Sequence, residues 1–354
     1  MIQLSDFEYT LPKELISQKP FEPRDSCRLM VLDDENIQHR KFTEFPTYLR
    51  SGDVIVLNDT KVNAFRLSGK KETGGAVDIL VLSRTNSIAT CLISGKGIHE
   101  GTRLSLGDGA IVAKILDKLD PGRYQIEFRL NPNISVSTDK ETLDRTLLSI
   151  SKAPLPPYIK EDLEDTNRYQ TIYANTPGSA AAPTAGLHFT NQMIDTIKNM
   201  DVNIAYVTLH IGTGTFLHVT EDTLKRNKLG NEFFKIDETT ANQINSTIES
   251  NDRLFVVGTS TLRALESSIR NGKVIPQISS TELFIYPGYQ FKLKFHGLLT
   301  NFHLPRSTLL MLVCAYTGRE RILKAYNEAI EHKYRFYSFG DAMLIFNNKM
   351  NPKK

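Results

Sequence analysis

The hydrophobic rhythm of the chain changes once along its length, and this change limits the folds that the sequence allows. Between Val62 and Leu130, short hydrophobic runs alternate with turn signals such as Gly74-Gly75 and Gly107-Asp108-Gly109. Short strands at this spacing predict a small antiparallel β-barrel. Beyond Pro183, strand-like runs alternate with helical ones. That alternation predicts an α/β main domain, in which helices flank a mixed sheet.

Individual elements of the main domain follow from the period of the apolar residues. Strands are expected over Asn203–Ile211 and Arg253–Gly258, with helices over Asp237–Ser250 and Thr261–Gly272. The clearest helix follows Gly318, because apolar residues recur there at one-face spacing.

The barrel is expected as an insertion in the main domain. Residues 62–152 are predicted to form the barrel, and residues 1–61 with 153–354 a discontinuous catalytic domain. The Pro-rich segment Ala153–Ile159 is the expected linker where the chain returns from the barrel.

Composition narrows the class of protein. The first residues lack the pattern of a signal peptide, and the longest apolar run, Leu309–Tyr316, is far shorter than the ~20 residues of a membrane span. We therefore expect a cytoplasmic protein without membrane contact. The three cysteines have no CxxC spacing, which argues against a disulfide framework and a thiolate zinc site. A net charge of +3 does not by itself indicate a nucleic-acid partner, although Arg66–Lys71 is a local basic patch.

Polar residues interrupt an apolar stretch at Leu299–Leu310. Asn301, His303 and Pro305 lie between two runs that would otherwise be core, and buried polar groups without partners cost ~2–7 kcal/mol. A structural turn explains His303 taken alone. A second cluster of this kind, Ala182–Thr190, favours one shared functional site.

Four segments are expected to converge on that site. Ala182–Thr190 supplies His188, a candidate acid or base. The Gly-x-Gly of Gly212 and Gly214 follows a strand, although this motif alone is weak evidence. Thr259 and Ser260 begin a helix that bears Arg263, an arrangement that suits an anion, while an ordinary N-cap is the commoner explanation. The last segment joins Asn301 and His303 to Tyr334–Leu344, which carries Asp341.

A polar cluster also follows the strand Val54–Leu57. Asn58, Asp59 and Thr60 lie where α/β sheets place ligands, although a simple turn explains Asp59 equally well. The common Walker, HExxH and GxSxG motifs are absent from the sequence.

In their order along the chain, these motifs resemble one family closely. NDTKV, YQTIYA, APTAGLHFT, TLHIGTGTF, VGTSTLRALES, FIYPGY, TNFHLPRSTLLMLV and YRFYSFGDAML resemble the S-adenosylmethionine:tRNA ribosyltransferase-isomerases of queuosine biosynthesis over essentially the whole chain. The resemblance implies transfer and isomerisation of the ribosyl moiety of S-adenosylmethionine onto 7-aminomethyl-7-deazaguanine in the tRNA anticodon. Epoxyqueuosine-tRNA, adenine and methionine are the products.

This chemistry assigns expected roles to the candidate residues. His188 or His303 is expected to act as the acid or base. Asn301 and Asp341 are expected to orient the ribose and the base, and Arg263 to bind a carboxylate or a phosphate. S-adenosylmethionine is the consumed co-substrate, and we expect no cofactor, no metal and a monomer. The residues expected to bind substrate are Asn58, Thr60, Arg66, Thr184, Gly186, His210, Gly212, Gly214, Thr259, Ser260 and Arg263.

The chain departs from the family pattern at several positions. Leu229-Gly230 replaces the usual Met-His, His296 an Asp and Lys61 an Arg, and the Thr-Thr-Ser turn is rearranged at Thr259–Thr261. A divergent paralogue with another substrate, a non-catalytic RNA-binding protein and a methyltransferase are the alternatives. The last would release S-adenosylhomocysteine.

Overall fold

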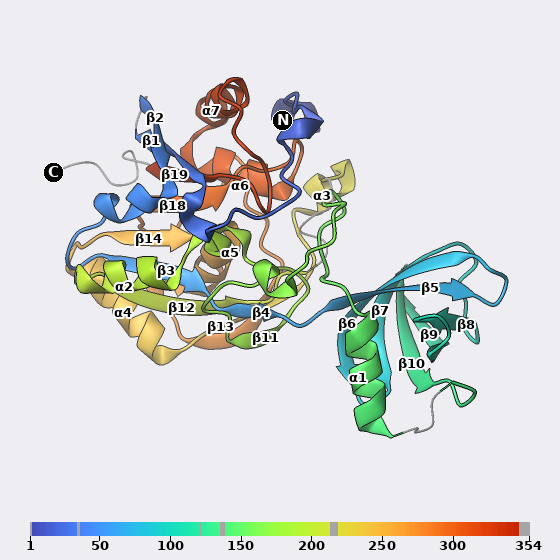
Figure 1. Ribbon diagram of the computed structural model, residues 1–354. Coiled ribbons are helices and arrows are strands. Elements are labelled where there is room, and N and C mark those ends of the chain that lie inside the picture. The colour runs from blue at the N-terminus through green and yellow to red at the C-terminus, as the bar shows by residue number, and fades with distance from the viewer. Residues whose placement is uncertain (1, 34–35, 121, 135–138, 213–218, 347–354) are drawn as a thin grey trace.

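The chain folds into two parts that lie side by side, shown in a computed structural model (Figure 1). The structure describes residues 2–33, 36–120, 122–134, 139–212 and 219–346. A mixed sheet with flanking helices forms the larger part, and a closed antiparallel barrel forms the smaller one. The predicted fold class is therefore confirmed. Among the described residues, no helix has the length and apolar character needed to span a membrane.

The main domain is built on a nine-stranded sheet in the order β17-β13-β12-β3-β14-β18-β19-β1-β2. Its centre is parallel where β12, β3, β14 and β18 pair, and antiparallel pairs lie at both edges. The strands are β1 (Arg28–Asp33), β2 (Asn36–Lys41), β3 (Val54–Asn58), β12 (Asn203–Leu209), β13 (Glu232–Ile236), β14 (Leu254–Val257), β17 (Gln277–Thr281), β18 (Gly297–Asn301) and β19 (Ala342–Phe346).

Helices cover both faces of this sheet. Successive residues of β3 point to opposite faces: Val54 and Val56 join the core beneath α4, α5, α6 and α7, whereas Ile55 and Leu57 pack with α2. The helices are α2 (Asn191–Asn199), α3 (Glu221–Arg226), α4 (Glu238–Glu249), α5 (Thr259–Ser268), α6 (Thr308–Thr317) and α7 (Arg319–Glu331). Short 3-10 helices cover Leu4–Phe7, Lys13–Leu15, Arg24–Ser26, Phe42–Tyr48, Thr166–Tyr169 and Thr184–His188.

The smaller part is a closed barrel in the order β10-β7-β6-β5-β8-β9. Apolar side chains alternate with polar ones along its strands, so the buried set fills the interior. Leu143 and Leu147 of α1 (Lys140–Ile150) join this core. The strands are β5 (Phe65–Lys71), β6 (Ala76–Thr85), β7 (Ile88–Ser94), β8 (Arg103–Leu106), β9 (Ile111–Asp120) and β10 (Arg123–Leu130).

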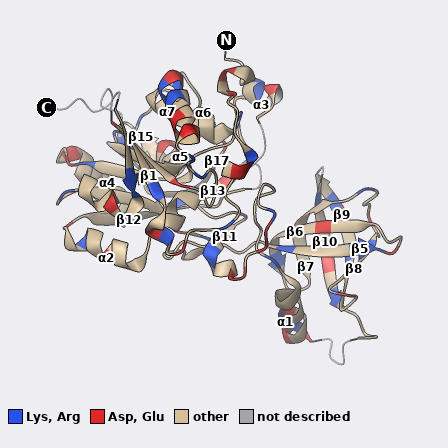
Figure 2. Ribbon diagram, turned by 45° about the horizontal axis from the view of Figure 1, so that its top comes forward, with Lys and Arg blue, Asp and Glu red and all other residues tan. Residues whose placement is uncertain are grey.

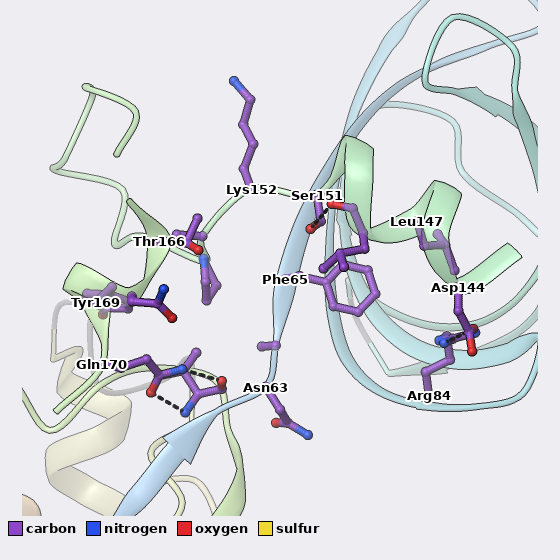
Figure 3. A pocket seen from close by; sticks show the side chains of 16 residues that line it. Asn63, Phe65, Arg84, Asp144, Leu147, Ser151, Lys152, Thr166, Tyr169 and Gln170 are labelled. Carbon is purple, nitrogen blue, oxygen red and sulfur yellow. Dashed lines mark hydrogen bonds and ion pairs between the residues drawn. The ribbon is translucent and has the colours of Figure 1, made fainter. Parts of the chain in front are cut away.

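Two paired chain segments connect the barrel to the main domain. Arg66 and Lys152, on the outgoing and returning segments, exchange two backbone hydrogen bonds of 2.9 Å. Beside them lies a cavity of about 320 Å³ whose walls come from both parts, including Phe65 and Tyr169 (Figure 3). The Gln170 side chain bonds both backbone groups of Val62 across this junction. The remaining short strands are β4 (Thr60–Val62), β11 (Thr176–Ser179), β15 (Ile269–Arg270) and β16 (Lys273–Val274).

One predicted helix boundary was wrong. The helix expected to run to Gly272 ends at Ser268, because Ile269–Arg270 turns back and pairs with Lys273–Val274. Asn271 and Gly272 have φ angles of 50° and 75°, as a tight hairpin turn requires. The Asn-Gly pair, which is a hairpin signal, outweighed the helical pattern before it.

Candidate active site

A cavity opens where the parallel strands β3, β14 and β18 end, the usual ligand site of an α/β sheet. Its walls come from the segment around Thr184, the first turn of α5, the end of β18 and the residues that follow it. Its free volume is about 40 Å³, so a nucleoside must extend beyond it or displace its walls. The lining residues are Ala182, Pro183, Thr184, Ala185, Ile211, Gly258, Thr259, Ser260, Arg263, Thr300, Asn301, His303 and Leu309.

Asn301 presents an amide oxygen with no hydrogen-bond partner among the residues that the structure describes. The residue is 2% exposed, and its Nδ2 donates to His188 Nε2 and to the Tyr337 carbonyl, both at 3.1 Å. Both amide hydrogens are therefore used, while the buried Oδ1 accepts no hydrogen bond from the described residues. A buried acceptor left unpaired costs about 1–3 kcal/mol. A donor on a bound ligand would remove this cost.

His188 lies behind Asn301 and does not line the cavity. Its Nε2 faces the Asn301 amide nitrogen, which can only donate, so the ring proton belongs on Nδ1, 3.2 Å from Cys27 Sγ. Burial, with a smaller contribution from the charge of Arg24, lowers the pKa of His188 to about 3. The neutral ring thus fixes the orientation of Asn301.

His303 lines the cavity and is also buried. Its Nε2 lies 3.0 Å from Thr300 Oγ1, and its backbone N–H donates to the Tyr326 hydroxyl at 3.0 Å. The Tyr9 hydroxyl donates to its carbonyl oxygen. Burial lowers the pKa of His303 to about 3, so the ring is neutral at physiological pH and is a weak base there. His303 therefore has the hydrogen bonds expected of a structural residue and also lines the cavity.

Arg263 contributes a buried guanidinium to the same cavity. It is 4% exposed; Nη1 pairs with Glu232 Oε2, and Nε donates to the Leu283 carbonyl at 3.0 Å. Glu232 Oε1 also accepts from the Gly212 N–H at 2.7 Å. The Arg263 Nη2 is buried and has no hydrogen-bond partner among the described residues. Two residues of the cavity wall thus each have one buried atom without a hydrogen-bond partner among the described residues, a donor on Arg263 and an acceptor on Asn301.

Asn58 supports the cavity from the end of β3. Its Nδ2 donates to Ser260 Oγ and to the Leu209 carbonyl at 3.0 Å, and its Oδ1 accepts from the N–H groups of Thr60 and Leu209. All hydrogen-bonding groups of the amide are thus used, and one of these bonds holds Ser260. Thr60 Oγ1 in turn lies 2.7 Å from His210 Nδ1.

Gly186 is required by a close approach rather than by ligand contact. A Cβ at this position would lie 2.0 Å from the Tyr173 hydroxyl oxygen, so no side chain fits there without a shift. Gly186 therefore belongs to the packing that supports the cavity.

The structure brings six predicted site residues into the cavity walls: Thr184, Thr259, Ser260, Arg263, Asn301 and His303. His188 and Asn58 contact residues that line the cavity. Gly212 is connected to it one step further away, through Glu232, the ion-pair partner of Arg263. Thr60 and His210 bond one another. Gly214 lies outside the described residues.

Two predicted residues have structural partners away from the cavity. Asp341 is 0% exposed and accepts from the backbone N–H groups of Arg28 and Arg335 at 2.7 and 2.8 Å, as well as from the Arg28 side chain. Arg66 lies in the barrel and pairs with Asp78 at 3.5 Å. Neither residue is among the cavity walls.

Glu232 and Cys27 are neighbours of the site that sequence reasoning did not select. Glu232 stands next to the departure at Leu229-Gly230, which was a usable signal for it. Cys27 is recognisable only from its contact with His188.

One group of side chains has the composition of a metal site. Within the described residues, His39, Glu328 and His332 have ligand atoms that all lie within 4.8 Å of one another. They sit at the edge of the sheet and near the end of α7, and none lines the cavity.

Comparisons with known proteins agree on one family. The family model described as "Queuosine biosynthesis protein" matches residues 4–345. The S-adenosylmethionine:tRNA ribosyltransferase-isomerase of Acetivibrio thermocellus is 46% identical over 350 residues, which cover 97% of this chain and 100% of that protein. The protein of the same description from Caldanaerobacter subterraneus subsp. tengcongensis is 46% identical over 347 residues, covering 96% and 99%.

A solved structure extends this agreement to three dimensions. The crystal structure of S-adenosylmethionine tRNA ribosyltransferase from Thermotoga maritima is 34% identical in sequence, with a TM-score of 0.53. The match covers 96% of this chain and 100% of that one.

Proposed function

Because the chain belongs to the queuosine biosynthesis protein family, we propose that it acts as an S-adenosylmethionine:tRNA ribosyltransferase-isomerase. It transfers and isomerises the ribosyl moiety of S-adenosylmethionine onto 7-aminomethyl-7-deazaguanine in tRNA. The products are epoxyqueuosine-tRNA, adenine and methionine. S-adenosylmethionine is consumed, and we propose that no cofactor or metal takes part and that the protein is a monomer.

The observation that supports a site for S-adenosylmethionine is a pair of buried atoms, on two residues of the cavity wall, that have no hydrogen-bond partner among the described residues. Arg263 Nη2 is a buried cationic donor beside the first turn of α5, where backbone N–H groups favour an anion. The methionine carboxylate is the anion of the substrate. Thr259 and Ser260 supply further hydroxyl donors on the same wall.

Asn301 Oδ1 is the complementary acceptor. The ribose hydroxyls, the adenine amino group and the methionine ammonium group are the hydrogen-bond donors of the substrate, and any of them satisfies this atom. His188 is a positioning residue, because its neutral ring holds the Asn301 amide. Asp341 keeps a structural role through its bonds to Arg28 and Arg335.

His303 is the candidate for proton transfer. The reaction removes a proton from the carbon beside the sulfonium and delivers one to the departing adenine. A single group between these positions can therefore return the proton that it takes. Among the described lining residues, His303 is the one with an imidazole side chain, the group that most often transfers protons in enzymes.

Product analysis tests the proposed function. S-adenosylmethionine is incubated with the protein and either tRNA bearing the deazaguanine precursor or the same tRNA with unmodified guanine, and the small molecules are separated by chromatography. We expect free adenine and methionine with the modified tRNA alone. S-adenosylhomocysteine would identify a methyltransferase, and adenine release without tRNA dependence would contradict the proposed acceptor.

A further inference from the structure

The barrel carries a second hollow, here called the barrel groove, between its outer face and α1. Its free volume is about 930 Å³. Phe128, Leu130 and Leu143 contribute to it from the barrel and α1. Its charged lining residues are Arg103, Lys114, Glu127, Arg129 and Lys140.

The charges of the barrel groove are unevenly matched. Glu127 is its single carboxylate and pairs with Arg129 at 2.9 Å. Within the described part of the chain, Arg103, Lys114 and Lys140 form no ion pair. Figure 2 shows Lys and Arg segments on the barrel around β5 and β8.

Arg103 and Lys114 are direct cross-strand partners on β8 and β9. Both are exposed, so their side chains leave the barrel on the same face. Side chains directly opposite one another have Cβ atoms about 5 Å apart, and like charges in such positions are destabilising. Lys114 also lies opposite Glu127 on β10, and this carboxylate offsets part of the repulsion. An anion bound between Arg103 and Lys114 would remove the rest.

The junction between the two parts shows the opposite pattern. Arg84 pairs with Asp144 beside the junction cavity (Figure 3), and Lys152 pairs with Asp162 at 2.5 Å. Arg66, from the basic patch noted in the sequence, pairs with Asp78. The cations at the junction are thus already paired with carboxylates, whereas three cations of the barrel groove form no ion pair among the described residues.

We propose that the barrel groove binds the phosphate backbone of the tRNA substrate, with Arg103 and Lys114 as its main contacts. That the bound polyanion is tRNA rests on the proposed function. That it binds in the barrel groove rests on charge complementarity. The barrel groove therefore holds the tRNA at a distance from the cavity in which S-adenosylmethionine reacts. Affinity for tRNA depends on the barrel, whereas affinity for S-adenosylmethionine does not.

The test compares two variants that lose the same net charge. One is Arg103→Gln with Lys114→Gln; the control is Lys198→Gln with Lys324→Gln, two exposed lysines of α2 and α7. Dissociation constants for the tRNA are measured over a salt series, together with the KM values for both substrates. Each lost phosphate contact lowers the log-log salt slope by about one.

We expect the groove variant to bind tRNA at least about tenfold more weakly, with a salt slope lower by about two. Its KM for S-adenosylmethionine and its turnover at saturating tRNA should match the control. An unchanged slope and tRNA KM, in a wild-type protein that releases adenine with tRNA, overturns the barrel groove as the tRNA contact. A wild-type protein inactive with tRNA refutes the proposed function instead.

A charge-reversal variant separates binding from folding. Arg103→Glu places a carboxylate opposite Lys114, an attractive cross-strand pair, so thermal stability should be retained. The tRNA affinity should fall below that of Arg103→Gln. Equal tRNA affinity in the two variants would contradict the proposal.

Discussion

Lowering the pH from 7 to 5 should destabilise the protein through two neutral histidines at its site. Burial lowers the pKa of both His188 and His303 to about 3, whereas an unfolded histidine titrates near pH 6.5. Acid therefore protonates the unfolded chain and leaves the folded rings neutral. The stability that these groups contribute is present above about pH 6.5 and is lost as the pH falls toward 3.

The size of the effect follows from linkage. Once the ring is protonated in the unfolded chain, each histidine lowers the free energy of unfolding by about 1.4 kcal/mol for every pH unit that the pH falls. Between pH 7 and pH 5 the loss is about 2 kcal/mol for each residue and about 4 kcal/mol for the pair. A loss of this size is a large part of a typical folding free energy.

Urea unfolding at pH 7, 6 and 5 measures this loss. The chain has 13 tyrosines and no tryptophan, so circular dichroism and tyrosine fluorescence serve as probes. His188→Gln and His303→Gln should each reduce the pH-dependent loss by about 2 kcal/mol. The control His99→Gln, at an exposed position in the barrel, should leave the loss at the wild-type value.

Two outcomes would refute the reasoning. One is a wild-type protein whose unfolding free energy is unchanged at pH 5. The other is a wild-type loss that persists in full in both single variants, which would mean that other groups cause it.

Two further predictions concern the cavity. His303→Gln should lower turnover by ~10²–10⁴-fold if the ring transfers a proton; normal turnover of the folded fraction would make it a scaffold residue. Glu232→Gln leaves the buried Arg263 without its carboxylate, so the KM for S-adenosylmethionine should rise at least about tenfold. Glu249→Gln, which breaks the exposed pair with Lys273, is its control, and equal KM values would dismiss the anchoring role of Glu232.

The barrel and the α/β domain could both be predicted from the sequence, because each gives a pattern of apolar residues that depends on local spacing. Helices α4 and α7 lie where the apolar period placed them, and strands β6, β7, β9 and β10 lie within the segment predicted to form the barrel. The motifs also identified the family, since long segments in a fixed order are specific. Local patterns failed where another local signal competed, as at Asn271-Gly272, where a hairpin turn replaced the end of a helix.

The contacts of the site depend on the tertiary structure, because its residues come from distant segments. Asn301 and Asp341 were equal candidates in the sequence. In the structure Asp341 accepts hydrogen bonds from Arg28 and Arg335, whereas the Asn301 Oδ1 has no partner among the described residues. His188 looked like a catalyst and lies behind the cavity wall. A sequence shows which polar groups exist. Only packing decides which of their atoms the protein itself satisfies, and those left over are available to a ligand.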